Sequence, residues 1–272
     1  MSYGSILVHL EFSGSSESRL QYATDLAGDL DAFLIGFTAS AIRPVHASEL
    51  GVGADTAYGD MLFRRNRERF EEIRQEFFDA AGIGLNSGWR DSEDLPTRAL
   101  LDNARCADLI VAGTPHGIAP RDIYRSIDPG DVVCAAGRPV LLVGDDAVYR
   151  HPRCALIGWK DTPEARRAVA FAVPFLKLAE HTVVLSVQEK DDDADTGAAD
   201  VVRYLMRHGI DSDVKTVTGR SGPDNFLDAV RTEGADLVVT GAYGHSRMRE
   251  RITGGFTRTL LMQKDLTRLM AG

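Results

Sequence analysis

The chain has 272 residues, more than most single domains contain, so its length predicts two domains of about 100–150 residues each. Hydrophobic residues at 44% and charged residues at 26% are typical of a water-soluble globular protein. The formal net charge of −9 argues against non-specific binding to nucleic acid or to a membrane surface, because both are anionic.

The cysteines and the N-terminus indicate a cellular location. Cys106, Cys134 and Cys154 are isolated, without a Cys-x-x-Cys pair, so they form neither a disulfide framework nor a zinc pattern, and each is interpreted as a small core residue. Residues 1–12 lack the charged segment and long apolar run of a secretory signal, and no run reaches the ~18 apolar residues of a membrane span. We therefore expect a cytoplasmic protein.

The first half alternates between strand and helix patterns. We expect strands at 4–12, 32–38, 85–89, 108–113 and 140–143, and helices at 17–29, 60–81, 96–106 and 131–136. Glycine and proline interrupt the pattern at 40–58 and 117–131, which are expected to be mainly loops.

The second half repeats this order. We expect strands at 154–159, 182–187, 213–217 and 237–240, with helices at 163–178, 198–208 and 224–231 and a further helix after Gly255. The segment ADLIVAGTPHG at 107–117 matches ADLVVTGAYGH at 235–245 with an offset of 128 residues. We interpret the chain as a tandem duplication, with domains at 1–147 and 151–272.

Alternating strands and helices predict parallel sheets covered on both faces, joined by right-handed crossovers. In open sheets of this kind, ligands bind beyond the carboxyl ends of the strands, where the strand order reverses. The ends of the first and fourth strands of each copy are therefore the expected ligand-binding positions.

A glycine-bounded loop follows the fourth strand of the second copy. The strand breaks at Gly241 and Gly244, and Gly254 and Gly255 open a helix further on. Glycines let the backbone approach a ligand, and the free N–H groups of a helix start favour an anion, so phosphate is the expected guest. The chain contains no GxxxxGK[ST], and neither first strand is followed by GxGxxG, which excludes a P-loop ATPase and a classical dinucleotide fold.

The motif carries a family resemblance. GAYG at 241–244, nine further residues and Gly254 form the pattern G-x2-G-x9-G, and ALIGWKDTPEARRAVAFAVPFL at 155–176 looks like a first strand, an acidic residue and a first helix. In these features the chain resembles the tandem two-domain members of the universal stress protein family. The resemblance covers nearly the whole chain, once in each half.

The resemblance implies a fold and a ligand. It implies two Rossmann-like, adenine nucleotide alpha hydrolase-like domains, each with an open five-stranded parallel sheet, that pair through their last strands. It also implies a stress-response protein that binds ATP or another adenine nucleotide, with or without magnesium. Asp161 would face the adenosine, Val187 would border the adenine, and Gly241, Gly244 and Gly254 would bring the backbone close to the phosphates.

The sequence departs from the family pattern at several positions. Gly255 stands where the family usually has Ser or Thr, and Thr257 could substitute for that hydroxyl only at a different spacing. In the first copy, His116 replaces the second motif glycine, and Glu11 stands where the second copy has Asp161. We interpret the first copy as a degenerate site whose main role is packing against its twin.

Several alternatives stay open. Asp161 could bind a ribose or adenine edge, or it could cap the helix that begins near Pro163. His245 could contact a phosphate, but no acid or nucleophile is paired with it by motif, so no catalytic residue is assigned. Arginines 247, 249 and 251 could gather around a triphosphate or form a solvated rim.

Regulation by nucleotide binding, with little or no hydrolysis, is the favoured function, and the histidines have no metal-ligand spacing. The alternative is a scaffold of the same fold that binds no nucleotide. Beyond the nucleotide and the twin domain, a homodimer and an unknown protein are further candidate partners.

Overall fold

The computed structural model describes residues 2–43, 55–82, 86–114, 122–188, 197–218, 222–242 and 255–272. Strands and helices alternate in the N-terminal half, as the sequence predicts. In chain order they are β1 (Ser5–His9), α1 (Glu17–Leu30), β2 (Phe33–Ala39), α2 (Asp55–Ala81), β3 (Ser87–Ser92), α3 (Pro96–Asn103), the short 3-10 helix Ala104–Cys106, β4 (Leu109–Gly113), α4 (Pro129–Ala135) and β5 (Val140–Val143).

The C-terminal half repeats the alternation. Its elements are β6 (Cys154–Trp159), α5 (Pro163–Leu176), β7 (His181–Gln188), α6 (Ala198–Arg207), β8 (Asp213–Thr218), α7 (Pro223–Glu233), β9 (Leu237–Gly241), α9 (Phe256–Leu261) and β10 (Thr267–Ala271). Within the described ranges, no helix is both long enough and apolar enough to cross a bilayer.

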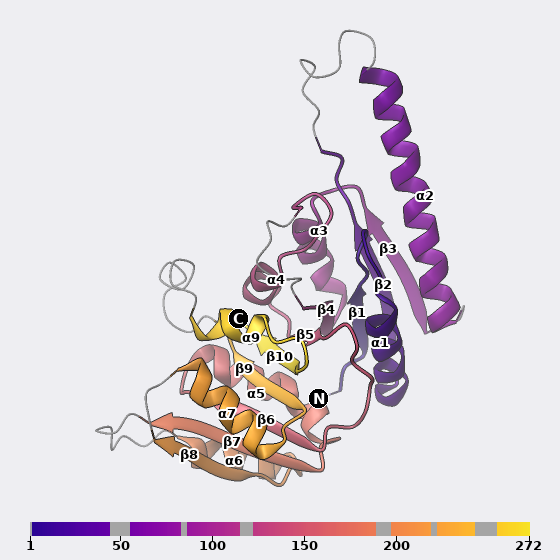
Figure 1. Cartoon of the computed structure of the whole chain (residues 1–272). Coiled ribbons are helices and arrows are strands. Elements are labelled where there is room, and N and C mark those ends of the chain that lie inside the picture. Colours follow the sequence, from indigo (N-terminus) through magenta and orange to yellow (C-terminus); the bar gives the residue numbers. More distant parts are fainter. Residues whose placement is uncertain are drawn as a thin grey trace.

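The strands form a ten-stranded sheet with the order β3-β2-β1-β4-β5-β10-β9-β6-β7-β8. Neighbouring strands are parallel within each half, and the only antiparallel pair among the described strands is β5 with β10, where Leu141 lies opposite Leu269. The two halves therefore meet through their last strands (Figure 1). The predicted fold of two tandem five-stranded parallel sheets is confirmed.

Both faces of the sheet are covered by helices. One apolar cluster holds buried residues of α1, α2, α5 and α6, and the other holds buried residues of α3, α4, α7 and α9. The central strands contribute side chains to both clusters in alternation, because successive residues of a strand point to opposite faces. Continuous apolar strands such as LIVAG and LVVTG are the expected result.

Two aspartates show the duplication in structural detail. Asp108 accepts hydrogen bonds from the backbone N–H groups of Gly4 and Ser5 at 2.9 and 3.1 Å, which anchors the start of β1 to β4. Asp236 makes the same contacts with Arg153 and Cys154, both at 3.1 Å, at the start of β6. Positions 108 and 236 differ by the offset of 128 residues predicted from the sequence.

Some predicted element boundaries are wrong by a few residues. Helix α2 begins at Asp55 rather than near residue 60, and β3 spans Ser87–Ser92 rather than 85–89. Helix α4 begins at Pro129 because Asp128 caps it, accepting a hydrogen bond from the Gly130 N–H at 2.8 Å. Proline is favoured at the first helical position, where its missing N–H leaves no bond unmade, so the helix begins two residues before the predicted start at 131.

A buried arginine lies at the junction of the halves. Arg268 of β10 is 0% exposed, and its Nη2 donates to Thr114 Oγ1 at 2.8 Å. Its Nε and Nη1 have no hydrogen-bond partner among the residues that the structure describes, and desolvation lowers the pKa of Arg268 to about 10. The guanidinium therefore stays charged at neutral pH, at a cost that the surrounding packing must offset.

Candidate functional site

The strand order places a candidate site in each half. It reverses between β1 and β4 and between β6 and β9, which are adjacent in the sheet. The pairing is equivalent in the two copies, with Ile6 opposite Leu109 and Ala155 opposite Leu237. The carboxyl ends of these strand pairs are the positions where such sheets bind ligands.

Asp161 follows β6 at the edge of the C-terminal half. Its Oδ1 accepts a hydrogen bond from Arg166 Nε at 2.8 Å, and both side chains are more than half exposed. The cap of α5 is Thr162, whose Oγ1 accepts from the Ala165 N–H at 3.2 Å. The alternative that Asp161 caps this helix is therefore wrong, and its contact with adenosine stays a prediction.

Gly241 ends β9 against the first turn of α5. A Cβ at this position would lie 2.5 Å from the backbone N of Ala165 and 2.7 Å from the backbone C of Glu164. No other residue fits without moving the helix. The packing of the protein alone therefore requires glycine here, whether or not a phosphate binds.

The remaining predicted residues are only partly described. Val187 is the penultimate residue of β7, and Gly255 precedes α9 with an extended backbone (φ −67°, ψ −175°). Thr257 is 3% exposed in the first turn of α9. Gly244, His245 and Gly254, and the arginines at 247, 249 and 251, lie outside the described residues.

In the N-terminal half, Arg19 lies at the carboxyl ends of β1 and β4, the position equivalent to the candidate site of the C-terminal half. Its Nη1 donates to the His9 carbonyl at 2.6 Å and lies 3.6 Å from Glu11 Oε1, and the side chain is 4% exposed. A Cβ at Gly113, the counterpart of Gly241, would lie 2.2 Å from Arg19 Nη2. An internal cation therefore occupies the carboxyl ends of β1 and β4. Nothing in the sequence distinguishes Arg19 from its neighbours, because it lies in an ordinary helical pattern.

His9 shares this buried cluster. Its side chain is 0% exposed, and Nδ1 lies 3.6 Å from Glu11 Oε1. Within the described part of the chain, neither ring nitrogen has a hydrogen-bond partner. The pKa of His9 is lowered from 6.5 to about 4, mainly by burial; Glu11 opposes the shift and Arg19 contributes to it. The imidazole is therefore neutral at physiological pH, and the predicted structural role for this histidine is consistent with its position.

The depressed pKa of His9 predicts acid-dependent stability. Because the neutral ring is favoured in the folded state, the stabilisation is complete above pH 6.5 and is lost as the pH falls towards 4. We expect a loss on the order of 3 kcal/mol in the free energy of unfolding across this window. Urea unfolding at several pH values should show that the free energy of unfolding depends less on pH in His9→Leu than in the wild type. An unchanged pH dependence would contradict the depressed pKa of His9.

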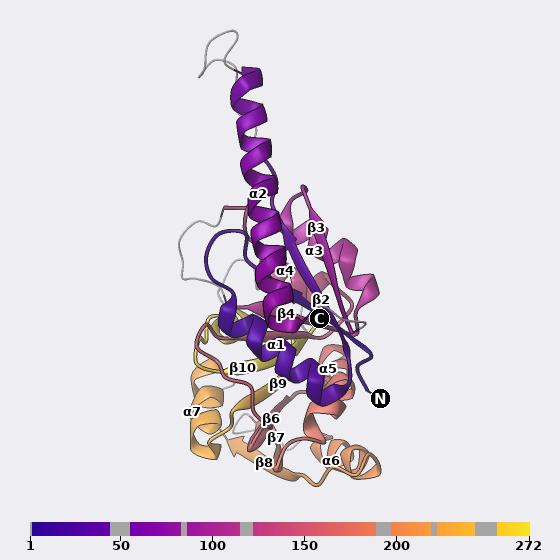
Figure 2. The same cartoon turned by 90° about the vertical axis from the view of Figure 1, so that its right-hand side faces the viewer.

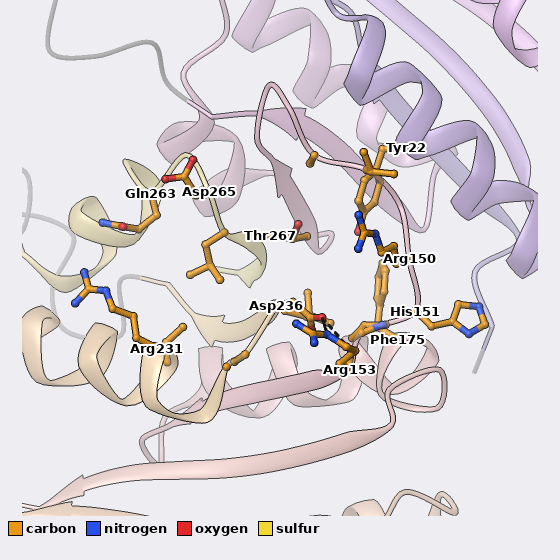
Figure 3. Close-up of a pocket in the computed structure, with 18 of the residues that line it drawn as sticks. Tyr22, Arg150, His151, Arg153, Phe175, Arg231, Asp236, Gln263, Asp265 and Thr267 are labelled. Carbon is orange, nitrogen blue, oxygen red and sulfur yellow. Dashed lines mark hydrogen bonds and ion pairs between the residues drawn. The ribbon is translucent and has the colours of Figure 1, made fainter.

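A separate cavity of about 660 Å³ lies at the opposite edge of the C-terminal half, beside the starts of β9 and β10. Figure 3 shows Arg150, Arg153 and Tyr22 on one side and Arg231 and Gln263 on the other. Three aspartates also line it, equal in number to the three arginines, so the lining favours neither sign of charge. This cavity is distinct from the predicted nucleotide site.

Cysteines and metal ligands add no chemistry in the described ranges. Cys154 is buried, Cys106 and Cys134 are half-buried, and none of the three forms a disulfide within the described ranges. No group of three or more His, Cys, Asp or Glu side chains in the described part of the chain is placed to hold a metal ion. The prediction that the cysteines are core residues is right for Cys154 and only partly right for the other two.

Comparison with known proteins supports the fold. No model of a protein family and no curated protein matches the chain. A universal stress protein from Archaeoglobus fulgidus has a similar structure, with a TM-score of 0.74 at 15% identity over 98% of this chain and 95% of the other.

Two proteins from Pseudomonas aeruginosa are also similar. A functionally unknown protein from strain PAO1 has a TM-score of 0.56 at 18% identity, over 99% of this chain and 92% of the other. A candidate universal stress protein from strain UCBPP-PA14 has a TM-score of 0.55 at 16% identity, over 99% and 93% of the two chains. These similarities extend over both halves of the chain.

The fold and the two positions at which the strand order reverses define a tandem α/β protein with one candidate ligand site in each copy. More specifically, the chain has the universal stress protein fold, as the resemblance in its sequence predicts.

Proposed function

We propose that the C-terminal half binds ATP or another adenine nucleotide at the carboxyl ends of β6 and β9 and acts as a regulator in a stress response. The observation that carries the proposal is the G-x2-G-x9-G motif, which begins at Gly241 at the end of β9 and reaches Gly254 just before α9. Main-chain N–H groups in such a loop suit a phosphate chain. Asp161, exposed at the end of β6, is within the same edge and would face the adenosine.

We propose one nucleotide site per chain. In the N-terminal half, taken as residues 1–147, the guanidinium of Arg19 stands over Gly113, the counterpart of the first motif glycine. In the C-terminal half, taken as 151–272, the atoms of the described residues nearest to a Cβ at Gly241 belong to the backbone of Glu164 and Ala165 and not to a charged side chain. This difference supports a packing role for the first copy.

Binding without turnover is the expected behaviour. No acid, base or nucleophile in the described residues is arranged around the strand ends as a catalytic set, and magnesium would be held by the nucleotide phosphates. We expect the protein in the cytoplasm, where ATP is available and the thiols of the three cysteines remain reduced.

Gly244→Val tests the proposal. The branched side chain would block the close approach of phosphate to the loop. The affinity for ATP, measured by calorimetric titration, should therefore fall by at least about tenfold. The matched control is His116→Val, at the corresponding position of the first copy, which should bind ATP as the wild type does. Equal loss in both variants would contradict a single C-terminal site.

A scaffold that binds no nucleotide is the second candidate function. Gly255 supplies no hydroxyl, and Thr257, the proposed substitute, is buried in the first turn of α9 rather than at the surface. Under this alternative, folded wild-type protein gives no heat with ATP and magnesium. Mass spectrometry of the purified protein for a retained nucleotide separates the two candidates at little effort.

A further inference from the structure

The side chain of Arg268 crosses the junction between the two halves. Arg268 lies in β10, opposite Leu142 of β5. Its Nη2 nevertheless reaches Thr114, which follows β4 on the far side of β5. Figure 2 shows β4 and β10 near the middle of the molecule, between the N-terminal elements above and the C-terminal elements below. A group bound to this guanidinium would therefore lie where the two halves meet.

Most of the hydrogen-bonding capacity of Arg268 is unused. An arginine guanidinium can donate hydrogen bonds through each of its nitrogens. Thr114 Oγ1 accepts from Nη2, whereas Nε and Nη1 find no acceptor among the described residues. The residue is 0% exposed, so bulk water does not reach these donors. Buried donors without an acceptor are rare in folded proteins, and a bound water or ion is a common explanation.

The charge of Arg268 favours an ion over a water molecule. A second buried guanidinium, that of Arg19, lies at the same end of β4, against Gly113. Burial lowers the pKa of Arg19, and the carboxylates of Glu11 and Asp145 oppose that shift. Burial also lowers the pKa of Arg268, but no carboxylate in the described part of the chain opposes it. A water molecule would accept a hydrogen bond and leave this charge uncompensated, whereas an anion would do both.

We propose that a small oxyanion of the phosphate class binds the guanidinium of Arg268 at the junction of β4, β5 and β10 and stabilises the contact between the halves. Oxyanions suit arginine because their oxygens match the planar N–H donors of the guanidinium and carry the opposite charge. The anion must be small enough to be enclosed with a completely buried side chain. It would offset the desolvation cost that packing alone must otherwise meet.

The proposed anion site is separate from the proposed nucleotide site. Arg268 lies opposite Val238, near the start of β9, whereas the glycine motif begins at Gly241, at the end of that strand. The inference therefore does not depend on nucleotide binding. The two sites can be tested separately in the same protein.

Titration with sodium phosphate tests the proposal. The full-length protein is first unfolded in urea and refolded in chloride buffer, which removes any oxyanion retained from the cell. Because the anion binds only the folded chain, the folding equilibrium constant should rise about 100-fold when phosphate reaches a hundred times its dissociation constant. Sodium chloride at the same ionic strength should have no such effect. Wild-type protein that is not stabilised by ~10 mM phosphate overturns the proposal.

Arg268→Met identifies the site. Methionine keeps an apolar stem and removes the charge and the donors. We expect this variant to lose the stabilisation by phosphate, and to be at least as stable as the wild type in chloride buffer, because an uncompensated buried cation is removed. Arg268→Lys keeps the charge without the planar donors and should bind phosphate at least about tenfold more weakly, which gives a second test if the methionine variant does not fold.

Two control variants should respond to phosphate as the wild type does. Arg166→Met removes an exposed arginine that is paired with Asp161. Gly244→Val blocks the proposed nucleotide loop. A response that persists in Arg268→Met and disappears in Gly244→Val would place the phosphate in that loop and overturn the proposal. Failure of the wild type to bind ATP, with the response to phosphate intact, would count against the proposed function alone.

Discussion

Arg19→Met is expected to lower the free energy of unfolding by about 3–5 kcal/mol, because it breaks a buried ion pair from one side. Glu11, whose side chain is 14% exposed, would lose the guanidinium that lies 3.6 Å away. The His9 carbonyl would also lose its N–H donor at 2.6 Å. Methionine preserves most of the aliphatic volume, so the loss reports the charge and the hydrogen bond rather than a cavity.

Two comparisons make this prediction specific. Arg166→Met breaks the Arg166–Asp161 pair at the equivalent edge of the second copy, where the side chains are 61% and 56% exposed, and should cost less than about 1 kcal/mol. Adding Glu11→Gln to Arg19→Met should recover part of the loss, because the unpaired buried charge is then removed. Chemical denaturation measures all four proteins. A cost for Arg19→Met no larger than that for Arg166→Met would contradict the interpretation that Arg19 and Glu11 form a buried ion pair.

Removal of Arg19 should also shift the titration of His9. Arg19 lowers the pKa of this histidine, so the pKa of His9 should rise when the cation is absent. The acid-sensitive window between pH 6.5 and about 4 would then become narrower. A merely structural arginine outside the cluster would leave this window unchanged.

Gly241→Ala is expected to destabilise the protein by about 3 kcal/mol or more, and Gly113→Ala by only about 1 kcal/mol. The two glycines end equivalent strands, and alanine would face different neighbours at each. At Gly241 the added methyl meets the backbone of Glu164 and Ala165, which cannot move without shifting α5. At Gly113 it meets the end of the Arg19 side chain, which can adjust.

Urea unfolding of the two alanine variants gives the comparison directly. Equal losses would show that Arg19 is held as rigidly as a helix backbone. The difference also affects how nucleotide-binding data are interpreted: loss of binding in a Gly241 variant would report disrupted packing of α5 as well as any phosphate contact. Gly244→Val is therefore the cleaner probe of the loop.

The sequence by itself determined the fold class and the duplication. The apolar runs LIVAG and LVVTG and the helical periods between them depend on local chemistry, because strands buried on both faces and amphipathic helices have distinct patterns. The 128-residue offset is likewise a property of the chain alone. The strand β10 was not located in this way, because the five residues TRLMA have a polar start and include an arginine.

Tertiary structure alone decided which side chains meet at the sheet edge. Arg19 and Gly113 are far apart in sequence and touch because β1, β4 and α1 converge at the carboxyl end of the sheet. Thr162 rather than Asp161 caps α5 because its oxygen, and not the carboxylate, reaches the Ala165 N–H. The spacing of apolar residues along the chain predicts helices and strands. The contacts and exposure of a side chain depend instead on where elements distant in the sequence end in space, and these positions are fixed only when the chain folds.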